Sequence, residues 1–317
     1  MDSELYLPHT GWFAHEPDDE VATYLYEGWF EYREQAFARL YLRPGDAVLD
    51  AGAHFGLYSV ICCRAGVAPE AVLALEPNPA VLPFLVSNLE RNGMDGVRVR
   101  AEALWSRAGE RAFYPAGPGR SAYSSLIPEP GAAAVAVQAV TLDEICAADQ
   151  FALVKIDIEG AELAALEGAR ETLRAGRLPL VVVECTELNL RRSGAGTRDL
   201  FEAIASLGYE VFRFDDGNLQ LVPRSYDGPI WFDNLYVTAD AAFVNARLRS
   251  AAMEQKRIAA DILRRGRACQ RLYSRAESAH LTETRMAELL ESKYLALGWR
   301  FGVAARPAWL SEYRKRS

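Results

Sequence analysis

The chain has 317 residues and lacks several features that would assign its class at once. It contains no run of eighteen apolar residues, so we expect no membrane-spanning helix. The segment M-D-S-E-L-Y-L-P-H-T at its start has neither a basic region nor an apolar stretch, and we therefore expect no secretory signal and a cytoplasmic location. The five cysteines show no C-x-x-C spacing, so neither a disulfide nor a zinc site is expected.

The chain is also short of positive charge, and the deficit is uneven. It carries 43 Asp and Glu against 35 Lys and Arg, and its formal net charge is −8. Residues 241–317 hold sixteen of the basic residues and seven of the acidic ones, which leaves residues 1–240 with a net charge of −17. An acidic body argues against a nucleic-acid partner. A basic extension suits contact with a partner protein, with an anionic lipid surface at the inner membrane face, or with the acidic body itself.

The central part of the chain has a pattern typical of an α/β fold. Apolar strand patterns alternate with helical patterns, which predicts a doubly wound, mostly parallel sheet of seven strands. The expected strands are residues 47–50, 71–76, 97–103, 151–157, 180–185, 209–214 and 235–238, and the expected helices are residues 57–65, 80–92, 162–175 and 198–207. We divide the chain into an N-terminal cap (1–40), a ligand-binding domain (41–240) and a basic helical extension (241–317). A helical pattern over residues 20–40 is expected to cover the site.

A glycine-rich turn follows the first strand of this domain. The segment V-L-D-A-G-A-H-F-G-L-Y-S starts at Val48, and its glycines let a ligand approach the backbone where a Cβ atom would collide. The strand ends in an acid, Asp50, and the next strand ends in another, Glu76. Because parallel strands end at the same edge of a sheet, the two carboxylates are expected to lie close together and to hold the ribose of a nucleoside.

This turn lacks the dinucleotide fingerprint G-x-G-x-x-G and has D-x-G-x-x-x-G instead. No phosphate-binding loop is therefore predicted. An acid at the start of the loop repels a pyrophosphate and attracts a cation, and S-adenosyl-L-methionine carries both an ammonium and a sulfonium group. The pattern favours a class I methyltransferase-like domain. The alternative is a glycine-rich turn that binds no ligand.

A second polar motif, V-K-I-D-I-E-G-A-E, begins at Val154. The strand period of two places Lys155, Asp157 and Glu159 on one side, and Glu162 follows in the first helical turn. Three carboxylates and an ammonium group are costly to bury, and they lie at the edge where doubly wound sheets bind ligands. The alternative is that the two glutamates only cap the following helix.

Six motifs occur in an order that resembles the FkbM family of S-adenosylmethionine-dependent O-methyltransferases: D-A-G-A-H-F-G, L-E-P-N-P, L-D-E-I, K-I-D-I-E-G-A-E, V-V-V-E and N-L-Y-V. The resemblance covers about residues 28–238, so residues 41–240 are expected to form a methyltransferase domain. It implies methyl transfer to a hydroxyl group, often on a sugar or a macrolide. It also implies a cofactor site in which the methionine end meets Asp50, Gly52, Ala53 and Gly56, the ribose meets Glu76 beside Pro77 and Asn78, and adenine meets Glu102 and Ala103.

The residues suggest how the reaction would proceed. Methyl transfer from a sulfonium needs an in-line approach of the acceptor oxygen and removal of its proton. We expect Asp157 or Glu159 to accept this proton. His54 is the competing base because of its ordinary pKa, and the alternative is that His54 orients the cofactor.

Three further polar residues are assigned to the substrate: Lys155, Glu162 and Asn234. For Lys155 we favour an ion pair with Glu184 at the neighbouring strand end. Asn234 opens the last strand, where turn chemistry is the alternative to a binding role. No metal is assigned, although three carboxylates could hold one.

Two segments outside the strands invite alternatives. Residues 114–131 are rich in Pro, Gly and Ser and form either a mobile lid or an inert insertion. From Val244 to Leu297, apolar residues recur with heptad spacing. This pattern predicts either a long helix that pairs in a coiled coil, and hence a homo-oligomer, or a broken helix that folds back as a hairpin.

The expected function is O-methylation of a hydroxyl, on a sugar of a surface polysaccharide or glycolipid that the basic extension would help to meet at a membrane. A macrolide or another soluble natural product is the second expectation. From a different class, a non-catalytic interaction module with the same fold is the third.

Overall fold

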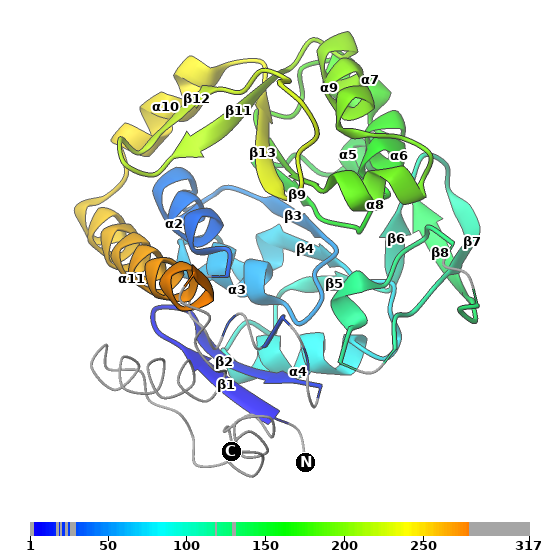
Figure 1. Cartoon of the computed structure of the whole chain (residues 1–317), viewed down its shortest axis with the longest axis horizontal. Coiled ribbons are helices and arrows are strands. Elements are labelled where there is room, and N and C mark those ends of the chain that lie inside the picture. Colours follow the sequence, from blue (N-terminus) through cyan, green and yellow to red (C-terminus); the bar gives the residue numbers. More distant parts are fainter. Residues whose placement is uncertain are drawn as a thin grey trace.

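The computed structural model describes residues 3–16, 19, 21–22, 25, 30–117, 119–128 and 131–278. Their core is an eight-stranded sheet, whose strands are β3 (Val48–Ala51), β4 (Val72–Leu75), β5 (Arg98–Arg100), β9 (Leu153–Ile156), β10 (Val181–Cys185), β11 (Glu210–Asp215), β12 (Gln220–Pro223) and β13 (Asp233–Thr238). The order is β12-β11-β13-β10-β9-β3-β4-β5 (Figure 1). The run from β10 to β5 is parallel, and β13, β11 and β12 continue it in antiparallel pairs.

The predicted doubly wound, mostly parallel sheet is confirmed, but the count of seven strands was wrong. The added strand is β12, which pairs with β11 through a tight turn held by the Asp215 carboxylate. Its four residues are too few to show strand periodicity, and it ends in Pro223, so no strand was predicted there. Residues 97–103 do not form one strand, because β5 ends at Arg100 and Glu102 begins β6 of a different sheet.

Two smaller sheets accompany the core. One contains β6 (Glu102–Leu104), β7 (Gly109–Phe113) and β8 (Val135–Val140) in the order β6-β8-β7. The other is a hairpin of β1 (Ser3–Leu7) and β2 (Gly11–His15). The hairpin was missed by the sequence patterns. Its β2 strand is held by the amides of Asn88 and Asn92, which exchange hydrogen bonds with the backbone of Ala14 and Trp12.

Helices cover both faces of the sheet, because consecutive strand residues point to opposite sides. Val48 packs in one core cluster and Leu49 in the other, and all four residues of β3 are buried. The first face is covered by α2 (Tyr32–Tyr41), α3 (Leu57–Arg64), α4 (Leu82–Arg91), α10 (Ala241–Arg249) and α11 (Met253–Ser278). The second face is covered by α5 (Leu142–Ala148), α6 (Glu162–Glu167), α7 (Arg170–Arg174), α8 (Glu187–Arg192) and α9 (Thr197–Ser206).

The helix predicted over residues 162–175 is two helices, α6 and α7. The chain comes so close to β6 at Gly168 that a Cβ atom there would lie 2.4 Å from the carbonyl oxygen of Trp105. The second helix then starts anew, because the Asp143 carboxylate accepts hydrogen bonds from the backbone N–H groups of Glu171 and Thr172. A contact distant in sequence therefore interrupts a continuous helical pattern.

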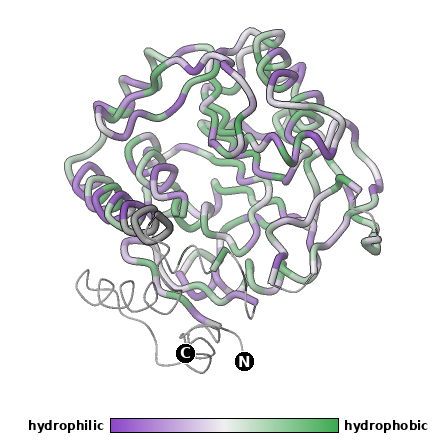
Figure 2. The backbone as a smooth tube through the Cα atoms, viewed as in Figure 1, coloured by the Kyte–Doolittle hydropathy of each residue, from purple (hydrophilic) through white to green (hydrophobic). Residues whose placement is uncertain are grey.

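The C-terminal heptad pattern packs on the body of the protein as far as the structure describes it. A break at residues 250–252 separates α10 from α11, and α11 lies against α2 (Figure 1). Gly266 of α11 meets the ring of Tyr32 so closely that a Cβ atom would lie 2.1 Å from it. In Figure 2 the central strands are green, and α11 alternates between purple and green, as an amphipathic helix does. Heptad positions after Ser278 fall outside the described residues, and coiled-coil pairing there stays a prediction.

Within the described part of the chain, no helix has the length and apolar character needed to cross a membrane. The five cysteines are free thiols, and four of them are buried.

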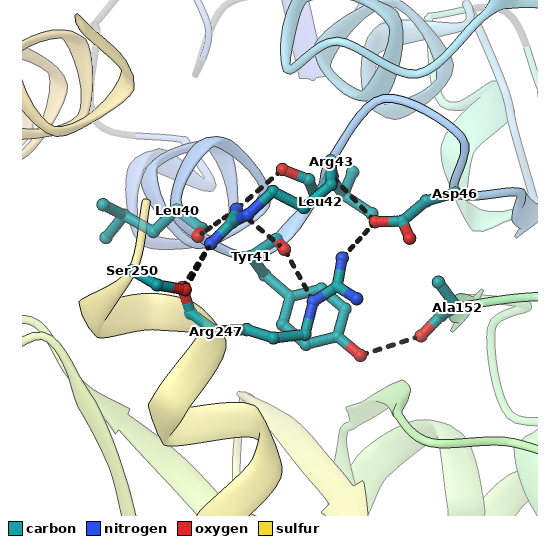
Figure 3. A network of polar contacts seen from close by, with 8 residues as sticks. All are labelled: Leu40, Tyr41, Leu42, Arg43, Asp46, Ala152, Arg247 and Ser250. Atoms are coloured by element: carbon teal, nitrogen blue, oxygen red, sulfur yellow. Dashed lines mark hydrogen bonds and ion pairs between the residues drawn. The ribbon is translucent and has the colours of Figure 1, made fainter. Parts of the chain in front are cut away.

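A polar network ties α10 to the loop between α2 and β3 (Figure 3). The guanidinium group of Arg43 donates to the carbonyl oxygens of Leu40 and Leu42 at 2.8 Å, where the last turn of α2 leaves acceptors free. Arg247 of α10 donates to the Tyr41 carbonyl at 3.1 Å and pairs with the Asp46 carboxylate. The network therefore fixes the entry into β3, the first strand of the site.

Replacing Arg247 with Met should lower the free energy of unfolding by about 1 to 3 kcal/mol, because it leaves the carboxylate of Asp46 and a helix-end carbonyl without this partner. The neighbouring Arg249 is exposed, so Arg249→Met changes the same charge and should stay within about 0.5 kcal/mol of the natural chain. Urea unfolding followed by circular dichroism measures both. Equal losses for the two variants would contradict a specific role for the network.

Candidate active site

A large cavity lies at the carboxyl ends of the parallel strands. Its volume is about 930 Å³. It opens between β3 and β9, which are neighbours in the sheet although about a hundred residues separate them, and this is where the strand order reverses direction. The walls come from the strand ends and from described residues of two other segments: Leu5, Phe13, His15, Val21, Ala22, Leu25 and residues 30–34 in the first, and Phe113, Ala116 and residues 120–126 in the second. Residues of the N-terminal segment therefore contribute to the site, and the predicted covering role of residues 20–40 stays a prediction.

The glycine-rich turn forms one edge of the cavity. Gly52 has φ +86°, and a Cβ atom on it would lie 1.7 Å from the backbone oxygen of Asp157, so only glycine lets β3 and β9 end this close together. Gly52, Ala53 and His54 line the cavity. Gly56 does not: a Cβ atom there would meet Leu85 of α4 at 2.7 Å, so this glycine serves helix packing and not ligand contact.

Glu76 lies in the cavity wall, and two backbone hydrogen bonds fix the orientation of its carboxylate group. One oxygen accepts the backbone N–H of His54 at 2.8 Å, and the other accepts that of Asn78 at 2.7 Å. Burial raises its pKa to about 7, against the lowering effect of these two hydrogen bonds. Each oxygen keeps a second lone pair, so the group can still accept two hydroxyl protons from a ribose. Pro77 also lines the cavity, whereas Asn78 is buried and holds Glu76 in place.

Asp50 is fully buried, and its carboxylate accepts the Ser59 hydroxyl at 2.7 Å. Its side chain projects from the same face of the sheet as that of Lys155, its register partner on β9. The structure does not place Asp50 among the residues that line the cavity, and its expected contact with the methionine end of the cofactor stays a prediction. Its carboxylate is one of the charges that raise the pKa of Lys155, after those of Asp157 and Glu31.

Glu102 and Ala103 line the cavity on the β6 side, and their expected contact with adenine stays a prediction. Glu102 pairs with Arg100 of β5. The break between β5 and β6 brings these residues to the cavity wall, because the chain leaves the main sheet at this point.

Lys155 is 4% exposed and forms its ion pairs with Asp157 at 2.6 Å and Glu31 at 3.2 Å. Among the described residues it does not form the expected pair with Glu184. Glu31 comes from the N-terminal segment, has φ +46° and is buried with its carboxylate toward Lys155. Sequence patterns missed it, because a single acid in an aromatic-rich helical pattern carries no signal of a partner more than a hundred residues away.

The turn after β9 presents Glu159 to the cavity. Glu159 has φ +57°, and its carboxylate accepts the side-chain amide of Asn189 at 2.6 Å. Glu162 lies behind this turn and accepts the backbone N–H groups of Ile158 and Gly160 at 3.0 to 3.1 Å. It does not line the cavity, so the expected substrate contact is not found. Glu162 is a positioning residue that holds Glu159 in its left-handed conformation.

His54 lies in the cavity wall with its Nε2 atom 2.9 Å from the Ser121 hydroxyl. Burial lowers its pKa to about 3. A neutral imidazole with so low a pKa is a weak base near neutral pH, which favours the orienting role over proton transfer.

Residues 113–126 close the cavity through three serine hydroxyls. Ser121 meets His54, Ser124 accepts the side-chain amide of Asn78 at 3.3 Å, and Ser125 donates to the carbonyl oxygen of Glu159 at 2.7 Å. Each motif of the predicted cofactor site is therefore in contact with this loop. The loop is part of the cavity wall.

Negative charge dominates the buried part of the site. Burial and repulsion from Asp157 raise the pKa values of Glu159 and Glu184 well above the ordinary range, and burial raises that of Glu162 to about 7. Asn234 stands opposite Glu184 on β13, lines the cavity and is 4% exposed. The site is thus built to receive positive charge.

These raised pKa values predict that mild acid stabilises the unliganded protein. The folded chain binds protons on Glu76 and Glu162 more tightly than the unfolded chain, so the free energy of unfolding should fall as the pH rises from about 5 to about 8. Urea unfolding at a series of pH values measures this slope. Glu162→Gln removes one of the groups and should flatten it, and a stability that rises with pH over this window would contradict the buried-acid description.

The chain matches one model in a comparison with known protein families. A family model described as the methyltransferase FkbM domain matches residues 50–211, about half of the chain. No curated protein sequence matches significantly. The class I methyltransferase-like fold expected from the sequence is confirmed.

Among solved structures, an FkbM methyltransferase from Methylobacillus flagellatus is similar with 19% identity and a TM-score of 0.42, over 64% of this chain and 47% of that one. The match thus spans about half of that protein. A precorrin-6y C5,15-methyltransferase from Geobacter metallireducens has 15% identity and a TM-score of 0.35, over 65% and 83% of the two chains. A SAM-dependent O-methyltransferase from Thermotoga maritima has 13% identity and a TM-score of 0.36, over 65% and 64%.

Proposed function

The chain belongs to the FkbM methyltransferase family, and from this premise we propose that it transfers a methyl group from S-adenosyl-L-methionine to a hydroxyl oxygen. The observation that carries the proposal is Glu76, whose carboxylate faces a cavity of about 930 Å³ at the strand switch point and keeps lone pairs for two hydroxyls. A volume of this size accommodates a cofactor and an acceptor together.

In this arrangement the ribose binds Glu76 and adenine lies between Pro77, Glu102 and Ala103. The methionine end runs along Gly52 and Ala53 toward Asp157. The surplus of carboxylates at this end supports a ligand that carries a sulfonium and an ammonium group, since opposite charges attract strongly in a site shielded from water. A pyrophosphate is negatively charged, so the same carboxylates would repel it.

The chemical step requires two contributions from the protein, the positioning of the acceptor and a general base. Holding the acceptor oxygen in line with the sulfur–methyl bond supplies most of the acceleration, on the order of 7 to 11 kcal/mol. A general base adds about 10² to 10⁴-fold. Glu159 is the stronger candidate for the base, because it lines the cavity, one of its oxygens is fixed by Asn189, and burial raises its pKa and so makes the carboxylate more basic. Asp157 already pairs with Lys155.

We propose that the hydroxyl belongs to a sugar on a glycolipid or a surface polysaccharide. The residues that line the cavity include charged side chains such as Arg213 and Asp216. Two large apolar side chains that line it are also exposed, Leu188 (63%) and Phe232 (60%), and Trp231 next to Phe232 in the chain is exposed as well (75%). Charged groups in the cavity together with exposed apolar side chains suit an acceptor whose sugar enters while a lipid part stays outside. A macrolide with attached sugars is the second candidate on the same observation.

Glu76→Gln should weaken binding of S-adenosylmethionine by about 10 to 100-fold, since it removes the charge and turns one acceptor into a donor that opposes a backbone N–H. Titration calorimetry with the full chain measures the dissociation constant. Glu202→Gln, on the exposed surface of α9, is the matched control and should bind normally. Unchanged affinity in Glu76→Gln would remove the ribose contact from the proposal.

Glu159→Gln should lower kcat by about 10² to 10⁴-fold with little change in cofactor affinity, because it removes the proton acceptor and keeps the shape. In the natural chain kcat should fall on the acid side as Glu159 becomes protonated, at a pH above the range of an ordinary carboxylate. Mass spectrometry of candidate glycolipids, glycans and macrolides after incubation with enzyme and cofactor detects the added methyl group. If kcat of Glu159→Gln still falls at low pH as it does in the natural chain, another residue is the base.

A further inference from the structure

Three carboxylates meet at the floor of the cavity. Asp157 follows β9, Glu159 lies in the next turn, and Glu184 is near the end of β10. One oxygen from each lies within 4.8 Å of the others. Carboxylate oxygens at such separations repel one another unless a proton or a cation lies between them.

The neighbouring groups leave oxygens of this cluster available. Lys155 bonds one oxygen of Asp157, and Asn189 bonds one oxygen of Glu159. For the Glu184 carboxylate, which is 8% exposed, no hydrogen bond is found among the described residues. Each of the three carboxylates can therefore offer an oxygen to a common ligand.

A fourth oxygen points to the same place independently. Asn234 is 4% exposed, and its Oδ1 atom is buried without a hydrogen-bond partner in the described part of the chain. Asn234 is the direct cross-strand partner of Glu184 in the antiparallel pair of β10 and β13, so the two side chains leave the sheet on the same face and lie next to each other. Both line the cavity. A buried amide oxygen without a partner is costly, and a bound ligand would remove that cost.

The side chains at the floor of the cavity carry more negative than positive charge. Lys155 is the ammonium group in contact with it, and that group is shared with Glu31 and lies beside the buried Asp50. Arg192 also lines the cavity, and its charge lowers the pKa of Glu159. Among the described residues, more carboxylates than basic groups act on this part of the cavity.

We propose that Asp157, Glu159, Glu184 and the Oδ1 atom of Asn234 hold a divalent cation, at a site to which the sequence alone assigns no metal. All four donors are oxygens, and no His or Cys belongs to the cluster, which selects a hard cation such as Mg²⁺, Mn²⁺ or Ca²⁺ over Zn²⁺. Water completes the coordination sphere on the cavity side. Insofar as the proposed function holds, this open side is where an acceptor hydroxyl would bind, and the cation would favour its oxyanion.

Binding of Mn²⁺ to the full chain tests the site without any assay of activity. Free Mn²⁺ gives a strong electron paramagnetic resonance signal that falls on binding, so a titration yields the number of sites and the dissociation constant. We expect one site per chain, from which Mg²⁺ displaces Mn²⁺. Absence of Mn²⁺ binding by the natural chain at millimolar concentrations would overturn the proposal, whatever the variants do.

Variants locate the site. Glu184→Gln and Asn234→Leu should each weaken Mn²⁺ binding at least tenfold, and Asn234→Asp, which adds a charged oxygen at the same position, should strengthen it. The matched control Glu202→Gln should leave it unchanged, and circular dichroism checks that each variant is folded. Equal Mn²⁺ affinity in all four variants would place the cation elsewhere and refute the assignment.

The test of the cation site and the test of methyl transfer can fail independently of each other. Mn²⁺ binding with no methylation of any acceptor leaves the cation site standing and counts against the proposed reaction. Methylation that survives removal of metal by a chelator, together with an absence of Mn²⁺ binding, leaves the reaction standing and refutes the cation site.

Discussion

The ammonium group of Lys155 is the interaction on which the site depends. It lies 2.6 Å from Asp157 and 3.2 Å from Glu31 in a region that is almost closed to water. Burying an unpaired ammonium, or carboxylates without an opposite charge, costs several kcal/mol per group, so these residues must be brought together or not buried at all. The ion pairs therefore link the N-terminal segment to the centre of the sheet.

One ammonium group does not neutralise its surroundings. The charges of Asp157, Glu31 and Asp50 act on the ammonium group of Lys155, and burial together with repulsion from Asp157 raises the pKa values of Glu159 and Glu184. Such a site is under-neutralised when it is empty. The proposed cofactor, with its positive sulfur, and the proposed divalent cation would each supply positive charge here. Asn189 already occupies one oxygen of Glu159, so the other oxygen would serve either the cation or the proton of the acceptor, and not both at once.

The walls of the cavity are assembled from segments that lie far apart in the chain. The closing loop reaches the cofactor motifs through Ser121, Ser124 and Ser125, and the N-terminal segment is supported from outside by α2 and α11, where Gly266 meets Tyr32. The basic C-terminal segment is thus not simply an appendage in its described part, because it packs in the same core as the strands of the site. Gln270 of α11 lines the cavity itself and accepts a hydrogen bond from the Tyr32 hydroxyl at 3.0 Å.

The sequence by itself determined the local parts: the alternation of strands and helices, the glycine turn after β3, the acids at the strand ends and the order of motifs that indicates the family. These are properties of short segments, which depend on side-chain period, glycine and strand-end chemistry. Local signals also explain the errors, since β12 is too short to show a period and α6 and α7 are separated by contacts of Gly168 and Asp143 with other segments.

Only the tertiary structure decided which charges meet. Glu31 pairs with Lys155, more than a hundred residues away in the chain, and Asn234 lies beside Glu184 because β13 is antiparallel to β10. The Asp50 carboxylate accepts the Ser59 hydroxyl and is not among the residues that line the cavity. Electrostatic and hydrogen-bonding energies depend on distance in space and on the exclusion of water. The order of residue types along the chain determines neither the distance nor the exclusion of water.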